Sequence, residues 1–320
     1  MITLGKQDGF DLKLRVIMAL FLLLLCMPFV VDSEGSTSGL PVIRILSDGS
    51  ISPPTDSIQR NGDVYTFSAD LYARIVVERD NIVIEGSGYT LHGNYNGTRT
   101  DSWVVGEGPY QDYNNGAIPW SIGIDLANEN VHNLTVKDLN IKNFYIGIYV
   151  WTPNNTVIGC SVSGNIVGVL LSGDSNILTK NYISGNEEGV FFGVNQPGSE
   201  PLNIVLVHNS FVDNIVHFSG CFCEVYNASE PIHTWDDGKE GNYWDTYNGT
   251  DAEGDGIGDI PYVIDVQNQD RFPLMRSIAS PLAETPEILV SSETLVAILV
   301  VLLITMIVIV AYRRRKAFDR

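Results

Sequence analysis

An acidic, glycine-rich stretch near the carboxyl end is the strongest candidate for metal chemistry. The segment DAEGDGIGD places Asp251, Glu253, Asp255 and Asp259 at loop positions 1, 3, 5 and 9, with glycine at position 6. Hard oxygen ligands in this pattern surround one point, as in calcium-binding loops. Position 12 is Tyr262, so the bidentate glutamate of a complete EF-hand loop is missing. We predict a weak calcium site, with a solvated acidic turn as the alternative.

Imidazole and thiolate groups, the ligands that copper and zinc prefer, are few in this chain. Those that could serve as ligands are His208, His217, Cys221, Cys223 and His233. On a strand, the two thiols of the Cys-x-Cys pair point to one face, but no second pair matches it. Copper is therefore the weaker metal prediction, and scattered structural side chains are the competing interpretation.

An aromatic cluster suggests a binding surface. Trp103, Tyr110, Tyr113 and Trp120 lie in or beside a long stretch rich in Asn, Gly and Tyr. Flat rings stack on sugar faces, and they also fill hydrophobic cores. We predict glycan or ligand binding by this surface, with a hydrophobic plug as the alternative.

Polysaccharide cleavage is the enzymatic alternative. Glycoside hydrolysis needs two carboxyl groups about 5 to 9.5 Å apart across one sugar bond. In the repeat described next, Asp138 aligns with Gly159 and Lys180, and no two acids align on neighbouring copies. We therefore assign no catalytic residue and favour a non-catalytic role.

The elements that must position these residues form a repeat of 21 residues. Residues 135–150, 156–171 and 177–192 align without gaps, and 205–220 continue the register after a connection seven residues longer. Three columns are apolar in every copy. They are Val136, Val157, Leu178 and Leu206; Ile141, Val162, Ile183 and Phe211; and Ile148, Val169, Val190 and Phe218. Such a period indicates a solenoid.

The short apolar runs favour strands, because they are β-branched and are broken by Gly or Asn. Asn165, Asn186 and Asn214 are expected to stack at one corner, and Gly147, Gly168 and Gly189 at another, since both residue types tolerate sharp turns. The predicted fold is all-β: a right-handed parallel β-helix with apolar columns inside. The Leu-x-x-Leu-x-Leu skeleton of leucine-rich repeats is absent.

The remaining segments give a domain plan. Residues 1–33 are a signal peptide or an uncleaved signal anchor, because an apolar run of sixteen residues from Val16 to Val31 follows Lys13 and Arg15. The other predicted segments are an N-terminal cap at 41–70, rungs at 71–225 with an inserted loop at 94–119, a C-terminal cap at 226–276, a stalk at 277–293, a transmembrane helix at 294–312 and a tail at 313–320.

Charge gives the predicted location. Between residues 32 and 292 there are 11 Lys and Arg against 34 Asp and Glu, a net charge of −23, which excludes nucleic acid as a partner. Four basic residues, Arg313 to Lys316, follow the apolar segment directly, so we expect a single-pass membrane protein with the body outside and the C-terminus in the cytoplasm. Partners are then the membrane, glycans or other surface proteins. Five Asn-x-Ser/Thr sites are compatible with glycosylation: Asn96, Asn133, Asn154, Asn227 and Asn248.

Two groups of motifs resemble a known family. They are the opening DNIVI at 80–84 with GYTL at 88–91, and the closing GNYWD at 241–245, DGIGDIPY at 255–262 and DRFPL at 270–274. These resemble the NosD-type β-helix family, whose name-giving members are periplasmic accessory proteins for copper sites. The resemblance implies this fold over about 41–275 and makes copper handling an alternative function. The predicted membrane tail and the Asp245-Thr246 dipeptide depart from the family pattern.

Overall fold

The computed structural model describes residues 39–96, 121–193, 201–220 and 232–278. These residues are all-β, and they contain no helix long and apolar enough to cross a membrane. The chain divides into two units, Met1–Gly39 and Leu40–Arg320, and every described strand belongs to the second. The predicted signal segment and the predicted transmembrane helix lie outside the described residues.

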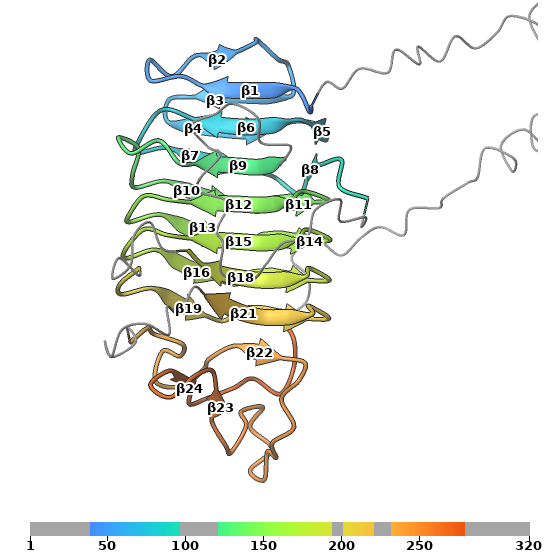
Figure 1. Ribbon diagram of the computed structural model, residues 1–320, viewed down its shortest axis with the longest axis vertical. Coiled ribbons are helices and arrows are strands. Elements are labelled where there is room, and N and C mark those ends of the chain that lie inside the picture. The colour runs from blue at the N-terminus through green and yellow to red at the C-terminus, as the bar shows by residue number, and fades with distance from the viewer. Residues whose placement is uncertain (1–38, 97–120, 194–200, 221–231, 279–320) are drawn as a thin grey trace, which may run out of the picture. The chain divides into compact units, whose positions relative to one another are not determined.

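Most strands belong to three long sheets, in each of which strands from successive coils lie side by side (Figure 1). In spatial order, sheet A contains β2 (Ile51–Ser52), β1 (Val42–Ile45), β6 (Arg74–Val77), β9 (Ile122–Leu126), β12 (Ile146–Val150), β15 (Val167–Leu171), β18 (Glu188–Phe192) and β21 (Val216–Gly220). Sheet B contains β19 (Val205–Val207), β16 (Ile177–Thr179), β13 (Thr156–Ile158), β10 (Thr135–Lys137), β7 (Val83–Glu85), β4 (Val64–Phe67) and β3 (Ile58–Asn61). Sheet C contains β22 (Tyr243–Trp244), β20 (Ser210–Val212), β17 (Tyr182–Ser184), β14 (Ser161–Ser163), β11 (Asn140–Lys142), β8 (Thr90–His92) and β5 (Leu71–Tyr72).

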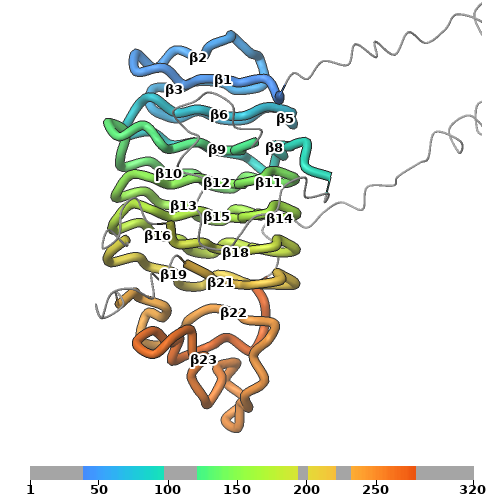
Figure 2. The backbone as a smooth tube through the Cα atoms, viewed as in Figure 1, coloured from blue at the N-terminus to red at the C-terminus, as the bar shows by residue number. Residues whose placement is uncertain are grey.

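Each coil of the backbone, here called a rung, contributes one strand to each sheet (Figure 2). Neighbouring rungs pair in parallel, and the three predicted columns are confirmed residue by residue: Val136 pairs with Val157, Ile141 with Val162, and Ile148 with Val169. Their side chains are buried in one continuous core. The chain is therefore a parallel β-helix, because equal rungs place equal residues on top of one another.

The turns between sheets use left-handed backbone at repeated positions. Between sheets B and C, four successive rungs from β10 to β20 have positive φ at Asp138, Gly159, Lys180 and His208, with φ from 51° to 64°. The predicted glycine corner was wrong, because Gly147, Gly168 and Gly189 lie inside strands β12, β15 and β18. A Cβ at Gly168 would come within 2.5 Å of the Gly189 carbonyl oxygen, so close rung contact is what requires glycine there.

Buried asparagine ladders join the rungs at all three corners. The predicted ladder of Asn165, Asn186 and Asn214 is confirmed, and each side-chain oxygen accepts the backbone N–H of the residue one rung earlier. Two further ladders repeat this bond. One consists of Asn181, Asn209 and Asn242, and the other of Asn155 and Asn176. The ladders satisfy backbone donors that the sheets leave unpaired where the chain turns.

Both ends of the stack depart from the parallel pattern. At the N-terminal end, β2 pairs antiparallel with β1, and β3 pairs antiparallel with β4. At the C-terminal end, β22 extends sheet C, and β23 (Tyr262–Val263) and β24 (Gln269–Asp270) form a separate antiparallel pair. These additions cover strand edges that would otherwise stay open for pairing with another chain.

The middle strands of sheet A, β12, β15 and β18, are apolar on both faces. Besides the core columns, Tyr149, Leu170 and Phe191 form a second buried cluster on the opposite face of β12, β15 and β18. Tyr95 packs against this cluster, and its hydroxyl donates to Glu187 Oε1 at 2.9 Å. The segment that follows β8 therefore reaches across several rungs.

Candidate functional site

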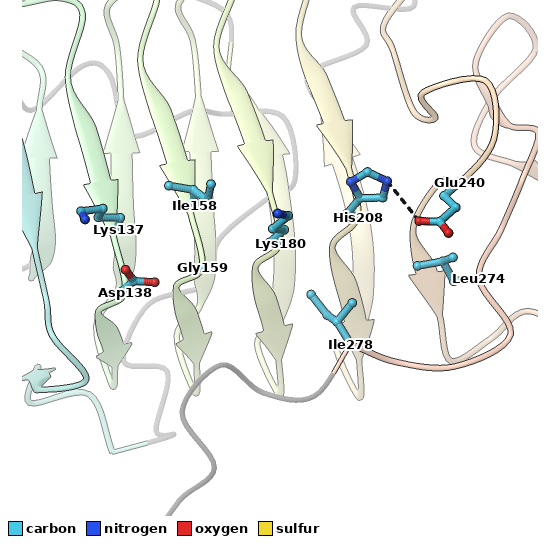
Figure 3. A pocket seen from close by; sticks show the side chains of 9 residues that line it. All are labelled: Lys137, Asp138, Ile158, Gly159, Lys180, His208, Glu240, Leu274 and Ile278. Atoms are coloured by element: carbon cyan, nitrogen blue, oxygen red, sulfur yellow. Dashed lines mark ion pairs between the residues drawn. The ribbon is translucent and has the colours of Figure 1, made fainter. Parts of the chain in front are cut away.

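A groove of about 680 Å³ runs along the corner between sheets B and C (Figure 3). Four successive rungs line it through Lys137, Asp138, Ile158, Gly159, Lys180 and His208. The C-terminal segment closes one side with Glu240, Leu274 and Ile278. The corner residues share left-handed backbone, so their side chains leave the turn at equivalent positions and lie in a row along the stack. We call this feature the corner groove.

The two lysines of the corner groove differ in their partners. Lys137 forms an ion pair with Glu85, and the hydrogen bond from this pair raises the pKa of the Lys137 ammonium. Lys180 is exposed and makes no ion pair with any described residue. Lys180 is therefore the cation in the groove that remains available to a ligand.

His208 lies at the C-terminal end of the groove beside two carboxylates. Its Nε2 atom is 3.4 Å from Asp237 Oδ2 and 3.5 Å from Glu240 Oε2. This Nε2 atom is buried and makes no hydrogen bond. Backbone N–H groups of Glu240 and Lys239 donate to Asp237 and lower the pKa of its carboxyl, so Asp237 is a charged neighbour of the imidazole.

The other predicted histidine ligands lie in different surroundings. His217 Nε2 is 2.7 Å from Asp245 Oδ1, and its ring packs near Phe211 and Trp244. His233 Nδ1 accepts the Ile204 N–H at 3.4 Å, and burial lowers the pKa of its imidazole to about 4.

The three described histidines of the copper prediction do not converge on one point. Among the residues that the structure describes, no group of three or more His, Cys, Asp or Glu side chains could hold a metal ion. Cys221 and Cys223 lie outside the described residues.

The carboxylates of the acidic loop at 251–259 accept hydrogen bonds from the loop and from Thr250 beside it. Asp251 accepts the backbone N–H groups of Gly254, Asp255 and Gly256 at 2.7 to 3.1 Å. Asp259 Oδ2 accepts the Thr250 hydroxyl at 2.8 Å and the Ala252 N–H at 3.0 Å. These carboxylates hold the turn closed through hydrogen bonds, so the arrangement gives the calcium prediction no support.

The remaining predicted site residues divide into two groups. The aromatic residues Trp103, Tyr110, Tyr113 and Trp120, and the glycosylation site Asn227, lie outside the described residues. The other four sequon asparagines, Asn96, Asn133, Asn154 and Asn248, are exposed. Cys160 is fully buried, and burial raises the pKa of its thiol to about 12, so it is unreactive at neutral pH.

The closing motifs complete the fold. The buried carboxylate of Asp270 accepts the Asn242 N–H at 2.7 Å and the Trp244 indole N–H at 2.9 Å, which ends one asparagine ladder. A Cβ on Gly241 would come within 1.8 Å of Asp270 Oδ1. Arg271 pairs with the buried carboxylate of Asp236 at 2.6 Å. The motif residues are therefore occupied in building the C-terminal cap.

The comparison with known families covers the rungs just described. Residues 121–249, which are 129 of the 320 residues, match the family model described as "Periplasmic copper-binding protein (NosD)". Over these residues the rungs are similar to that family. The resemblance predicted from sequence is thus confirmed, and the match extends from β9 past β22 to just before the acidic loop. No curated protein matches the chain.

Of the groove residues within 121–249, the sequence analysis proposed His208 alone as a ligand. Lys137, Asp138 and Lys180 belong to no motif, and Glu240 comes from the segment beyond the last repeat. The 21-residue register did contain a signal, since Asp138, Gly159, Lys180 and His208 share one column. The register could not show that the chain after β22 runs back along this corner and forms one side of the groove.

Proposed function

We propose that this chain is a non-catalytic, extracytoplasmic β-helix protein that binds a glycan along the corner groove. The family description places its members in the periplasm, which agrees with the acidic body and the predicted membrane tail. The location of the body outside a membrane and the single C-terminal span are parts of the same proposal.

The observation that carries the proposal is the composition of the groove. Apolar surface from Ile158, Leu274 and Ile278 lies beside charged groups on Asp138, Lys180 and Glu240. Sugars present both kinds of surface, because their C–H faces are apolar and their hydroxyls donate and accept hydrogen bonds. A concave site that joins apolar area to a few polar groups is the usual form of a ligand site.

The test is a glycan array probed with the full-length chain, followed by a variant that fills the groove. Ile158→Trp should abolish binding to the glycans that the native chain retains, because the indole occupies the groove. Ser163→Trp is the matched control, since Ser163 lies in the same rung on the outer face of sheet C. Equal binding by the native chain and Ile158→Trp would place the glycan elsewhere. Release of reducing sugar by the native chain would contradict the non-catalytic part.

Copper handling is the second candidate, favoured by the family description and by the unbonded Nε2 atom of His208. The described residues supply one imidazole and two carboxylates at this point, without forming a metal group. We assign no ligand set, and titration of the full-length chain with copper is the direct measurement.

A further inference from the structure

The lysines of the rungs between residues 121 and 220 are few, and most of them lie at one corner. Residues 121–220 contain three lysines and no arginine, and two of these lysines, Lys137 and Lys180, line the corner groove. The third, Lys142, lies in β11 of the adjoining sheet C. The groove lining sets these two lysines against two carboxylates, those of Asp138 and Glu240, so its formal charge is balanced within a body of net charge −23.

The ammonium group of Lys180 is the feature of the groove that favours an anionic ligand. It projects from the third of the four rungs that line the groove and has no ion pair among the described residues. A ligand that covers the groove removes water from this ammonium group, and burying an unpaired charge is unfavourable. The nearest groove acid in the same column is Asp138, two rungs away, or about 10 Å at the usual strand spacing. An acidic group on the ligand would supply the missing partner.

The direction of the groove favours a glycan over a peptide. The groove follows the stack, at right angles to the strands, for about 14 Å from Asp138 to His208. Backbone groups at this corner already bond from rung to rung: Asp138 N–H donates to Ile158 O at 3.2 Å, and His208 N–H to Gly241 O at 2.8 Å. A peptide would find no strand edge to pair with. Only side chains and the turn surface are available to the ligand.

We propose that the corner groove binds an acidic polysaccharide, with a uronic acid carboxylate paired to Lys180. This inference rests on the proposed glycan function. Asp138 and Glu240 would accept sugar hydroxyl groups, and Ile158 and Leu274 would contact the apolar faces of the rings. A chain of sugar units lying along the stack meets one rung after another, so each unit faces a different groove residue.

The experiment compares two forms of one polymer. Oligogalacturonate and its fully methyl-esterified form have the same backbone and differ in charge at the carboxyl group. Isothermal titration calorimetry with the full-length chain at low salt should show about tenfold tighter binding of the acidic form, the usual contribution of one charge-assisted hydrogen bond. The preference should shrink as salt is added.

Three variants assign this preference to Lys180. Lys180→Gln should bind both forms with equal affinity, and Lys180→Arg should keep the preference. Lys142→Gln, which removes a lysine outside the groove lining, is the matched control and should behave as the native chain. Circular dichroism of each variant checks the fold. An unchanged preference in Lys180→Gln would overturn the inference.

Binding measurements on the native chain distinguish failure of the uronate proposal from failure of the glycan proposal. Equal binding of the acidic and esterified forms would overturn the role of Lys180 and leave the glycan function standing. Binding of neither form, with glycans retained on the array, would reject uronates alone. An empty array together with no binding of either form would reject both proposals.

Discussion

At the scale of single residues, burial decides which polar groups take part in chemistry and which hold the fold. Cys160 and Asp270 are buried, His233 is half-buried, and each contacts fixed partners. Lys180 and His208 lie in the corner groove, and in each of them a polar group lacks a hydrogen-bond partner among the described residues. Within the groove, these two side chains are the ones that can turn a polar group to a ligand without breaking a hydrogen bond.

His233 makes stability depend on pH. The pKa of its imidazole is about 4 in the folded chain and 6.5 without burial, so between these values the unfolded chain binds more protons. This contribution to stability is complete above pH 6.5 and is lost as the pH falls towards 4. His233→Asn should therefore lose less stability than the native chain between pH 7 and pH 4.5, measured by thermal denaturation.

The control for this comparison is His132→Asn, because His132 is exposed. That variant should follow the native curve. If His233→Asn also followed the native curve, burial of His233 would not be the cause of the acid sensitivity.

At the scale of elements, rungs are joined by the asparagine ladders as well as by the sheets. Asn186 occupies the middle of one ladder, where its Oδ1 accepts the Asn165 N–H at 2.9 Å and its Nδ2 donates to Val162 O at 3.0 Å. The other two ladders repeat these bonds at the other corners. Each ladder thus replaces, at a corner, the hydrogen bonds that a strand would have made.

Removing one ladder residue should cost more than removing an exposed asparagine. Asn186→Ala leaves the Asn165 N–H and the Val162 carbonyl unpaired in the core, which should lower the free energy of unfolding by about 2 to 4 kcal/mol. Denaturant unfolding monitored by circular dichroism measures this loss. The control Asn130→Ala changes an exposed side chain and should stay within about 0.5 kcal/mol of the native value. Equal free energies of unfolding for the two variants would show that the ladder does not stabilise the fold.

At the scale of the whole molecule, charge and the terminal segments carry the prediction of where the body resides. The acidic body, the predicted N-terminal signal and the Arg313 to Lys316 cluster together predict an outside body and an inside tail. With this predicted orientation, the corner groove would face the medium in which polysaccharides occur. Location and proposed ligand agree with each other.

Protease accessibility tests this topology. Protease added to intact cells should remove the body and leave a protected fragment that begins near Thr294, and lysis should expose the remainder. An antibody against the C-terminal tail detects the fragment, and a cytoplasmic protein that stays intact until lysis is the control. Protection of the body before lysis would reverse the predicted orientation.

The sequence by itself determined the rungs. A 21-residue period fixes which residues stack, because each rung contacts only its neighbours and equal positions must lie on one another. Val136, Ile141 and Ile148 therefore identified three core columns, and the Asn165 ladder followed from the same register. The glycine column failed because spacing reveals that positions align, without revealing whether they lie in a strand or at a corner.

The tertiary structure alone decided the site. Glu240, Leu274 and Ile278 belong to no repeat, and their place in the groove lining depends on how the chain on both sides of β22 runs along the corner. The tertiary structure also decided that three histidines close in sequence lie in different places. His208 faces the groove, His217 faces Asp245, and His233 accepts a hydrogen bond from the Ile204 N–H. A sequence repeat predicts the contacts between neighbouring rungs, because equal positions stack. Contacts made by residues outside the repeat depend on the path of the folded chain, which the repeat does not specify.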